Sequence, residues 1–148
     1  MTDRLKGSRL ELLQVIENKN RAKRFVCEHV FPELTALCPT TGLPDFYTAG
    51  LVYEPDESLI ELKSLKYYLM SYRDKGIHHE ELANDILDDF IGTVNPRWVY
   101  LELQVSVRGG ISTYVRRFWN RESGDDIELA IKGAGYLTKD ELPKDMKR

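Results

Sequence analysis

A run of strictly alternating side chains over residues 98–107 constrains the fold of this chain more than any other feature. Its apolar positions are Val99, Leu101, Leu103, Val105 and Val107, and its intervening positions are Tyr100, Glu102, Gln104 and Ser106. Successive side chains of a strand point to opposite faces, so this pattern predicts a long strand with one face in the core. Arg108-Gly109-Gly110 interrupts the run, and residues 111–118 then have the composition of a returning strand.

The segments before this strand predict two more strands and two helices. Residues 24–30 and 47–53 are rich in β-branched and aromatic side chains and are separated by the turn-forming sequence CPTTGLPD. Residues 64–75 have helical composition with Ser64 as a possible N-cap, and residues 79–94 carry apolar side chains every three to four positions. The order strand, strand, helix, helix, strand, strand predicts an α+β fold in which both helices lie on one face of an antiparallel sheet.

The length and composition predict one domain with a short extension at each end. The chain has 148 residues, of which 42% are apolar and 30% charged, as in an average soluble domain. We expect the domain to span residues 22–120, with an N-terminal arm over residues 1–21 and a C-terminal tail over residues 121–148. A domain of this size has little room for separate cofactor and substrate domains, so a large ligand is expected at an edge or between subunits.

Charge and hydropathy argue against several classes of function. The formal net charge of -3 provides no general attraction to a phosphate backbone, so no direct binding of nucleic acid is expected. No apolar run is long enough to span a membrane and the first residues lack the apolar core of a secretory signal, so we expect a cytoplasmic protein. The two cysteines, Cys27 and Cys38, are too few for a disulfide scaffold and lack the companion ligands of structural zinc, although a single bridge between them stays open.

The segment PELTALCPTTGLPDF carries the strongest candidate for catalysis. Cys38 and Asp45 bracket a turn that contains two prolines and a glycine. A cysteine attacks as its thiolate, and because its ordinary pKa is about 8.5, backbone amides in such a loop would favour the reactive form. A carboxyl group brought back beside the thiol can then deliver a proton to the group that the thiol attacks. On spacing alone a structural explanation stays open, with Cys38 as a small buried apolar side chain and Asp45 as a turn residue.

Peroxide reduction is a second interpretation of the same thiol. Thr35 lies three residues before Cys38, as in the active sites of peroxiredoxins. Pro32, however, is one position too close to the cysteine for that motif, and the chain lacks the βαβ pattern of a thioredoxin-like fold. The sequence therefore favours another reaction for Cys38.

Three further clusters carry charges that suit a nucleotide-like ligand. Lys63 and Lys66 in ELKSLKYY would lie on one face of a helix, close to free amide donors of its N-terminus, where a phosphate is favoured. In HHEE, a carboxylate can accept two hydrogen bonds from a guanine-like ring. Arg108 with the two glycines that follow lets the backbone approach a phosphate that the cation neutralises. Each cluster also has a simpler explanation: solvated lysines, acidic capping of a helix, and a tight turn or β-bulge.

Together, LCPTTGLPDF, ELKSLKYY, HHEE and VRGGIS resemble the short, single-domain NADPH-dependent 7-cyano-7-deazaguanine reductases, the QueF family. The four motifs occur in the order and at the separations of that family, from Phe25 to Ser112. The resemblance implies a tunnelling fold, in which ββααββ subunits join their sheets into an oligomeric barrel with sites between subunits. It also implies reduction of the nitrile of 7-cyano-7-deazaguanine to 7-aminomethyl-7-deazaguanine by NADPH, in queuosine biosynthesis, without a metal.

The resemblance implies a role for each matching residue. Cys38 would add to the nitrile carbon to give a covalent thioimide, and Asp45 would protonate the nitrogen. The substrate-binding residues would be Ile60, Glu61, Leu62, His79 and Glu80, with Glu80 as the anchor of the base. The NADPH-binding residues would be Leu62, Lys63, Lys66, Arg108 and Gly109. The sequence departs from the family in the approach to Cys38, in TYVRRFW after RGGIS, and in the tail.

Two other functions are compatible with the same motifs. One is the addition of ammonia or another amine to the same nitrile without a reductant, against which ELKSLKYY argues. The other is a non-catalytic purine-binding module that keeps the tunnelling fold. Oxidation of NADPH separates a reductase from the first, and a cysteine adduct with the nitrile separates either enzyme from the second.

Overall fold

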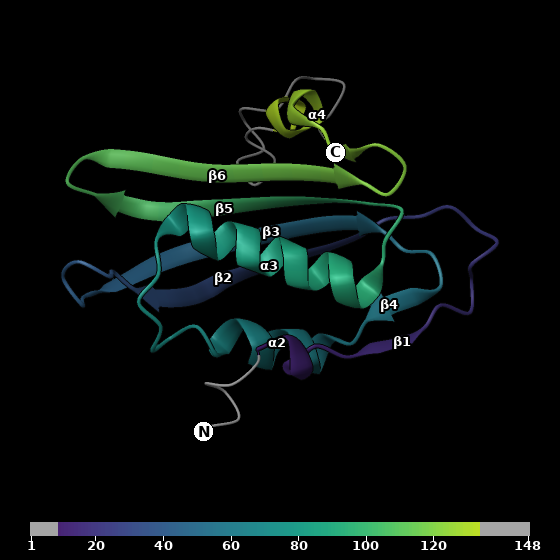
Figure 1. Ribbon diagram of the computed structural model, residues 1–148, viewed down its shortest axis with the longest axis horizontal. Helices are drawn as coiled ribbons and strands as arrows, with labels where there is room; N and C mark the ends of the chain where they lie inside the picture. Colours follow the sequence, from purple (N-terminus) through teal and green to yellow (C-terminus); the bar gives the residue numbers. More distant parts are fainter. Residues whose placement is uncertain (1–8, 134–148) are drawn as a thin grey trace.

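The computed structural model describes residues 9–133, and its centre is a five-stranded antiparallel sheet (Figure 1). The strands lie in the order β2-β3-β5-β6-β7. Their bounds are β2 Cys27–Leu37, β3 Pro44–Glu54, β5 Trp98–Arg108, β6 Ile111–Asn120 and β7 Gly124–Asp125. A separate two-stranded sheet pairs β1 (Val15–Glu17) with β4 (Ser58–Ile60). The predicted α+β class with an antiparallel sheet is therefore confirmed.

The alternating segment forms β5 in the middle of the sheet, as predicted. Its apolar positions from Val99 to Leu103 are at most 1% exposed, and the strand pairs with β3 on one side and β6 on the other. The hairpin between β5 and β6 turns through Gly109 and Gly110, whose φ angles are +59° and +79°. Residues with a side chain rarely adopt such angles, so the turn by itself explains both glycines.

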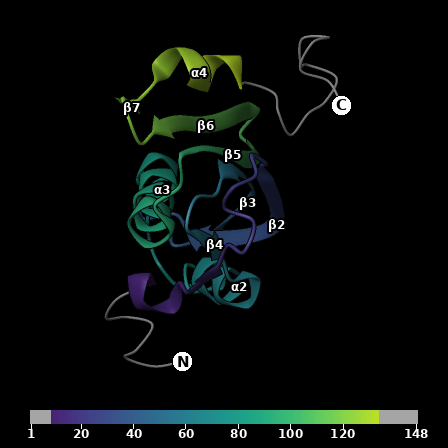
Figure 2. The same ribbon diagram turned by 90° about the vertical axis from the view of Figure 1, so that its right-hand side faces the viewer.

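Both long helices cover one face of the sheet, which confirms the predicted arrangement. α2 (Leu62–Met70) and α3 (His79–Val94) lie on the same side of the strands, whereas α4 (Ile127–Lys132) lies over β6 (Figure 2). The apolar sides of α2 and α3 and the inner face of the strands share one core. α3 has the bounds that its apolar periodicity predicts, and it ends where Asn95 adopts a left-handed conformation before Pro96.

The start of α2 differs from the sequence-based expectation. Glu61, rather than Ser64, is its N-cap: the two Glu61 carboxylate oxygens accept hydrogen bonds from the backbone N–H groups of Lys63 and Ser64, both at 2.8 Å. The Ser64 hydroxyl lies inside the first turn and donates to the backbone carbonyl of Glu61 at 2.7 Å. The expected N-cap was therefore wrong, because a carboxylate three residues earlier reaches the free N–H groups first.

The described segments outside the predicted domain of residues 22–120 pack against it. A short 3-10 helix, η1 (Arg9–Leu12), leads into Leu13, which is 7% exposed and belongs to the core, and then into β1. At the other end, Ala130 of α4 is buried, and the Tyr100 hydroxyl donates to the backbone carbonyl of Gly133 at 2.8 Å. Part of the predicted arm and part of the predicted tail thus contribute to the packing of the domain, and the rest of each lies outside the described residues.

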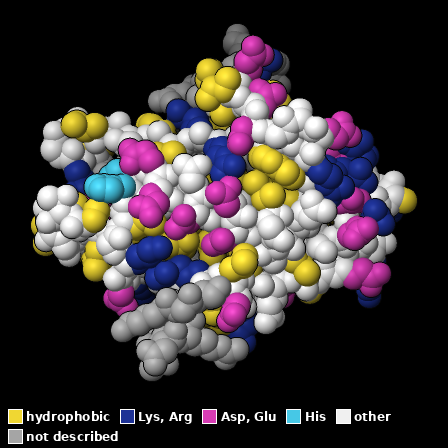
Figure 3. Space-filling view, viewed as in Figure 1, with side chains coloured by type: hydrophobic (Ala, Val, Ile, Leu, Met, Phe, Trp, Pro, Cys, Tyr) yellow, Lys and Arg dark blue, Asp and Glu magenta, His cyan; other side chains and the backbone are white. Residues whose placement is uncertain are grey.

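A charge cluster closes the end of the sheet where β3 leads into β4. Asp56 is 5% exposed, and its carboxylate accepts hydrogen bonds from Arg21 at 2.9 Å, Arg97 at 3.1 Å and Arg121 at 2.6 Å. Basic side chains gather at this end in Figure 3. Because the three arginines come from the chain before β2, before β5 and after β6, one carboxylate fastens three distant segments.

Candidate active site

The turn after β2 holds Cys38 in a closed loop. The Cys38 N–H donates to the carbonyl of Leu43, and the Gly42 N–H donates back to the carbonyl of Cys38, both at 2.8 Å. The pKa of Cys38 is lowered, first by a hydrogen bond from the Thr41 side chain and then by the backbone N–H groups of Thr41 and Thr40, while burial and the charge of Asp45 oppose the shift. The loop therefore favours the thiolate, as the sequence predicts, and Cys38 is partly exposed rather than a buried core side chain.

The connection between α2 and α3 forms two backbone hydrogen bonds with the residue just before this loop. The Leu37 N–H donates to the carbonyl of Lys75 at 2.9 Å, and the Ile77 N–H donates to the carbonyl of Leu37 at 3.0 Å. These bonds fix the end of β2 directly beside the start of α3. The local fold thus places the nucleophile candidate next to the HHEE segment.

Asp45 lies at the start of β3, opposite Ala36 of β2, and is 4% exposed. It is a strand residue, so the alternative of a turn residue was wrong. Arg108, the last residue of β5, donates from Nη1 to the Asp45 carboxylate at 2.8 Å and to the carbonyl of Pro44 at 2.7 Å. The arginine predicted to contact NADPH is therefore in direct contact with the predicted proton donor.

Tyr47 stands at the centre of the group and was missed in the sequence. It is 1% exposed, and its hydroxyl lies 2.7 Å from Nδ1 of His79, at the first turn of α3. Burial is the main cause that raises the pKa of Tyr47. Nearby charged groups also shift it: Asp45, Cys38 and Glu80 raise it, and Arg108 lowers it. The structure therefore brings five predicted site residues together around one buried phenol.

Gly109 directly follows Arg108 at this end of the sheet, whereas the other predicted residues, Ile60 to Lys63 and Lys66, lie at the opposite end. The Ile60 N–H donates to the hydroxyl of Tyr53 at 3.0 Å, and Tyr53 lies eight strand positions beyond Asp45. At about 3.3 Å per residue, Ile60 is about 26 Å from Asp45. In Figure 1, α2 begins beside β4, at the end of the sheet opposite to the one where α3 begins. One chain therefore does not unite Glu61, Leu62 and Lys63 with Cys38.

The N-terminus of α2 offers a phosphate fewer donors than the sequence suggests. Glu61 already accepts the N–H groups of Lys63 and Ser64, so two of the amides that were expected to be free have a partner. The Lys63 and Lys66 side chains are exposed, and no ion pair forms at either one within residues 9–133. Anion binding at this helix end would therefore depend on the two ammonium groups.

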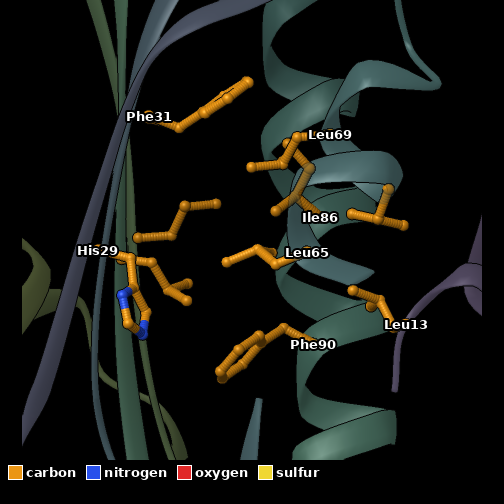
Figure 4. A pocket seen from close by; sticks show the side chains of 11 residues that line it. Leu13, His29, Phe31, Leu65, Leu69, Ile86 and Phe90 are labelled. Atoms are coloured by element: carbon orange, nitrogen blue, oxygen red, sulfur yellow. The ribbon is translucent and has the colours of Figure 1, made fainter. Parts of the chain in front are cut away.

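An open groove of about 270 Å³ runs between α2 and the edge strand β2. Its lining combines apolar side chains with charged ones: Glu28, His29, Val30, Phe31, Leu62, Leu65, Lys66 and Leu69. By contrast, the cavity in Figure 4 is an apolar gap of about 30 Å³ between sheet and helices, room for about one water molecule. A nucleotide-sized ligand can use the groove but not the gap.

The two cysteines do not form a disulfide, and both are free. They lie at opposite ends of β2, about 35 Å apart by strand geometry, whereas a disulfide needs Cα atoms within about 7 Å. The bridge that the sequence left open is thus impossible within one chain. Among the described residues, no cluster of His, Cys, Asp and Glu side chains could hold a metal ion, and no helix is long and apolar enough to cross a membrane.

Comparison with known proteins identifies the family of this chain. A family model described as QueF-like protein matches residues 44–123. The NADPH-dependent 7-cyano-7-deazaguanine reductase of Vesicomyosocius okutanii is 45% identical over 121 residues, which are 78% of this chain and 92% of the relative. That of Alkalilimnicola ehrlichii is 47% identical over 103 residues, 70% of this chain and 80% of the relative.

A solved structure shares the fold. The apo form of the archaeosine synthase QueF-Like superposes with a TM-score of 0.59 and 26% sequence identity, and the match covers 63% of this chain and 91% of that one. The tunnelling fold that the sequence predicts is thereby confirmed. With the family model, the reductase sequences and this fold in agreement, the chain belongs to the QueF family of NADPH-dependent 7-cyano-7-deazaguanine reductases.

Proposed function

We propose that this protein reduces the nitrile of 7-cyano-7-deazaguanine to 7-aminomethyl-7-deazaguanine with NADPH, as a step of queuosine biosynthesis. The observation that carries the proposal is the placement of Cys38, in a loop that favours its thiolate, beside the buried carboxyl group of Asp45. Reductases that are 40–47% identical over most of their length support it.

Cys38 and Asp45 perform the covalent part of the reaction. The Asp45 carboxylate takes the proton of the Cys38 thiol, the sulfur bonds to the nitrile carbon as one π bond of the nitrile breaks, and Asp45 passes this proton to the nitrogen, which gives a thioimide. The thioimide carbon accepts hydride far more readily than a nitrile does. NADPH supplies that hydride, the sulfur then leaves as the Cys38 thiolate while an imine forms, and a second hydride to the imine carbon with a proton from solvent to the nitrogen completes the amine. Two molecules of NADPH are therefore consumed per nitrile.

His79 and Glu80 hold the deazaguanine base in this proposal. Glu80 is exposed at the first turn of α3, next to the turn that carries Cys38, where its carboxylate is free to accept two hydrogen bonds from the ring N–H and amino groups. A base held there would have its nitrile aimed towards the thiolate. A ligand without the amino group would lose one of these bonds and leave a carboxylate oxygen without its partner.

The separation of the predicted residues supports a homo-oligomer. Ile60, Glu61 and Leu62 lie about 26 Å from the thiol end of the same chain, so they can complete a substrate site only if another copy brings them to it. The outer edge of β2 carries no partner strand among the described strands, and the groove with Lys66 runs along it. A barrel of several copies would pair such edges and close the site.

We propose the contacts to NADPH from the same arrangement. The exposed ammonium groups of Lys63 and Lys66 suit its phosphates, and Leu62 lies in the adjoining groove. In a second copy these residues would face the Arg108–Gly109 turn, whose backbone is open on the glycine side. The absence of direct contact with nucleic acid and a cytoplasmic location stay predictions.

Addition of an amine to the same nitrile is the closest competing function. The solved relative is named a synthase, but it is only 26% identical to this chain, well below the values for the reductases. Incubation with the nitrile and NADPH separates the two reactions. We expect the nicotinamide absorbance to fall only when both are present, and thioimide formation without any fall would refute reduction.

A non-catalytic purine-binding module is tested by the same adduct. Mass spectrometry should detect the mass of the nitrile on the wild-type protein and none on Cys38→Ala. Cys27→Ala is the matched control, because Cys27 lies at the far end of β2 and should not affect the adduct. An adduct that survives in Cys38→Ala would remove Cys38 from the mechanism.

A further inference from the structure

The contact between Tyr47 and His79 is a partly buried polar link between the sheet and the start of α3 in the site. The Tyr47 hydroxyl lies 2.7 Å from Nδ1 of His79, and the two rings meet edge to face with centroids 5.4 Å apart. Tyr47 is 1% exposed, whereas His79 is partly exposed. The phenol is therefore the inner, fixed partner and the imidazole is the outer one.

The partners available to each atom determine whether Tyr47 or His79 donates in this hydrogen bond. The phenol keeps its proton because burial raises the pKa of Tyr47. Within the described residues, Nδ1 of His79 is the acceptor that the structure gives to this hydroxyl. If Nδ1 carried a proton and donated it, the buried O–H would lose its acceptor, which is unfavourable for a polar group shielded from water. The hydroxyl thus donates, and Nδ1 presents its lone pair.

A neutral imidazole carries one proton, so a lone pair on Nδ1 places the proton on Nε2. Nε2 lies on the side of the ring away from Tyr47. His79 then presents an N–H donor next to Glu80, whose carboxylate is an acceptor. Such a donor and acceptor pair recognises a ring edge that carries an acceptor beside its N–H groups, as a guanine-like base does.

We infer that Tyr47 is a positioning residue that locks His79 in the Nε2–H form and thereby sets which edge of the purine the site accepts. The inference rests on the proposed function for the identity of the ligand, but the protonation state of His79 does not depend on it. The chain has three histidines, His29, His78 and His79, so their ring signals can be assigned by substitution.

The first test is nitrogen NMR of the protein labelled with ¹⁵N-histidine, assigned with His79→Gln. In the wild type we expect Nε2 of His79 to give the signal of a protonated ring nitrogen and Nδ1 that of an unprotonated, hydrogen-bonded one. Tyr47→Phe should give a mixture of the two tautomers. A protonated Nδ1 in the wild type, or an unchanged tautomer in Tyr47→Phe, would overturn the inference.

Tyr53→Phe is the matched control. It removes a hydroxyl from an equally buried tyrosine of the same strand, where the hydroxyl accepts a backbone N–H far from His79. It should leave the His79 signals unchanged, so a shift there as large as in Tyr47→Phe would show a general loss of packing and overturn the inference. If Tyr47→Phe fails to fold, the wild-type tautomer alone still decides.

The second test is kinetic. Loss of one hydrogen bond to the base should raise the KM for the nitrile by roughly three- to tenfold in Tyr47→Phe, with little change in kcat. A fall in kcat at unchanged KM would place Tyr47 in the chemical step instead and overturn its positioning role. If the wild type reduces no nitrile but the tautomer responds as expected, the proposed function fails and the role of Tyr47 stands.

Discussion

Replacement of Glu61 by alanine tests how α2 is held at the far end of the sheet. Glu61 accepts two backbone N–H groups at 2.8 Å, and the first turn of α2 itself contains no acidic residue. Loss of an N-cap costs about 0.5–2 kcal/mol, and loss of a carboxylate from a helix N-terminus costs about 0.3–1 kcal/mol. Because Glu61 is partly exposed, we expect a total loss of about 1–2 kcal/mol of unfolding free energy.

The assay is urea unfolding at fixed protein concentration, because self-association would make the midpoint depend on it. For a chain of this length, the expected loss lowers Tm by about 2–8 °C. Glu61→Asp should recover most of the loss, because aspartate is a good N-cap. In the reductase assay, fraying of the first turn of α2 should also raise the KM for NADPH, because Lys63 and Lys66 lose their fixed separation.

Glu57→Ala is the control for Glu61→Ala. Its carboxylate is 72% exposed and makes one ion pair with Arg21 at 3.2 Å, so its removal should cost less than about 0.5 kcal/mol. If Glu61→Ala is as stable as Glu57→Ala, the two backbone bonds do not stabilise α2 and the reasoning fails.

Three further predictions concern stability. The pKa of Asp56 is lowered to about 2, first by the hydrogen bond from Arg121. Its ion pairs therefore stabilise the fold fully above the ordinary carboxyl pKa of about 4, and this stabilisation is lost as the pH falls through about 2. Asp56→Asn should cost about 1–2 kcal/mol of unfolding free energy at pH 7, and a difference from wild type that does not shrink between pH 4 and pH 2 in urea unfolding would contradict this. Tyr68→Phe removes a 2.6 Å bond from the buried hydroxyl to the Asp89 carboxylate and should cost about 1–3 kcal/mol by the same assay; a loss below about 0.5 kcal/mol would argue against this bond. Gly133→Ala would bring a Cβ to 2.6 Å from the Tyr100 ring and should increase hydrogen exchange in α4. In Gly92→Ala the added Cβ meets nothing within 4 Å, so this substitution in α3 should stabilise the protein by about 0.5–1 kcal/mol. Equal exchange at α4 in both variants would contradict the expected effect of Gly133→Ala.

The sequence predicts the elements whose patterns repeat over many residues. The alternation of residues 98–107 and the apolar periodicity of residues 79–94 correspond to β5 and α3, because burial of a whole face determines both. The short elements were not foreseen. β1 and β4 have three residues each, so their strand form depends on one another and not on a local pattern.

Half of the candidate site was accessible from local motifs, and half depended on topology. Cys38 and Asp45 meet because a tight turn joins β2 and β3, which the spacing of prolines and glycine predicts. The contact of Arg108 with Asp45 and of Tyr47 with His79 depends on where β5 ends and α3 begins. The composition of residues 47–53 predicts only that Tyr47 lies in a strand, and no motif indicates which group its hydroxyl contacts.

The distance between the part of the candidate site with Cys38 and the part with Glu61 follows from the direction of β3. The strand carries the chain away from Asp45 towards Glu54, so any residue that follows shortly after, Ile60 and Glu61 included, must lie at the far end. The order of the motifs along the chain does not indicate this distance, and the topology is the reason why we propose a second copy.

The stoichiometry of NADPH oxidation against nitrile consumed tests the central claim most directly. Wild-type protein should oxidise two NADPH for each 7-cyano-7-deazaguanine converted to the amine, and Cys38→Ala should oxidise none. Cys38→Ala that still turns over the nitrile, or a wild-type protein that forms the cysteine adduct and leaves NADPH unoxidised, would contradict the account.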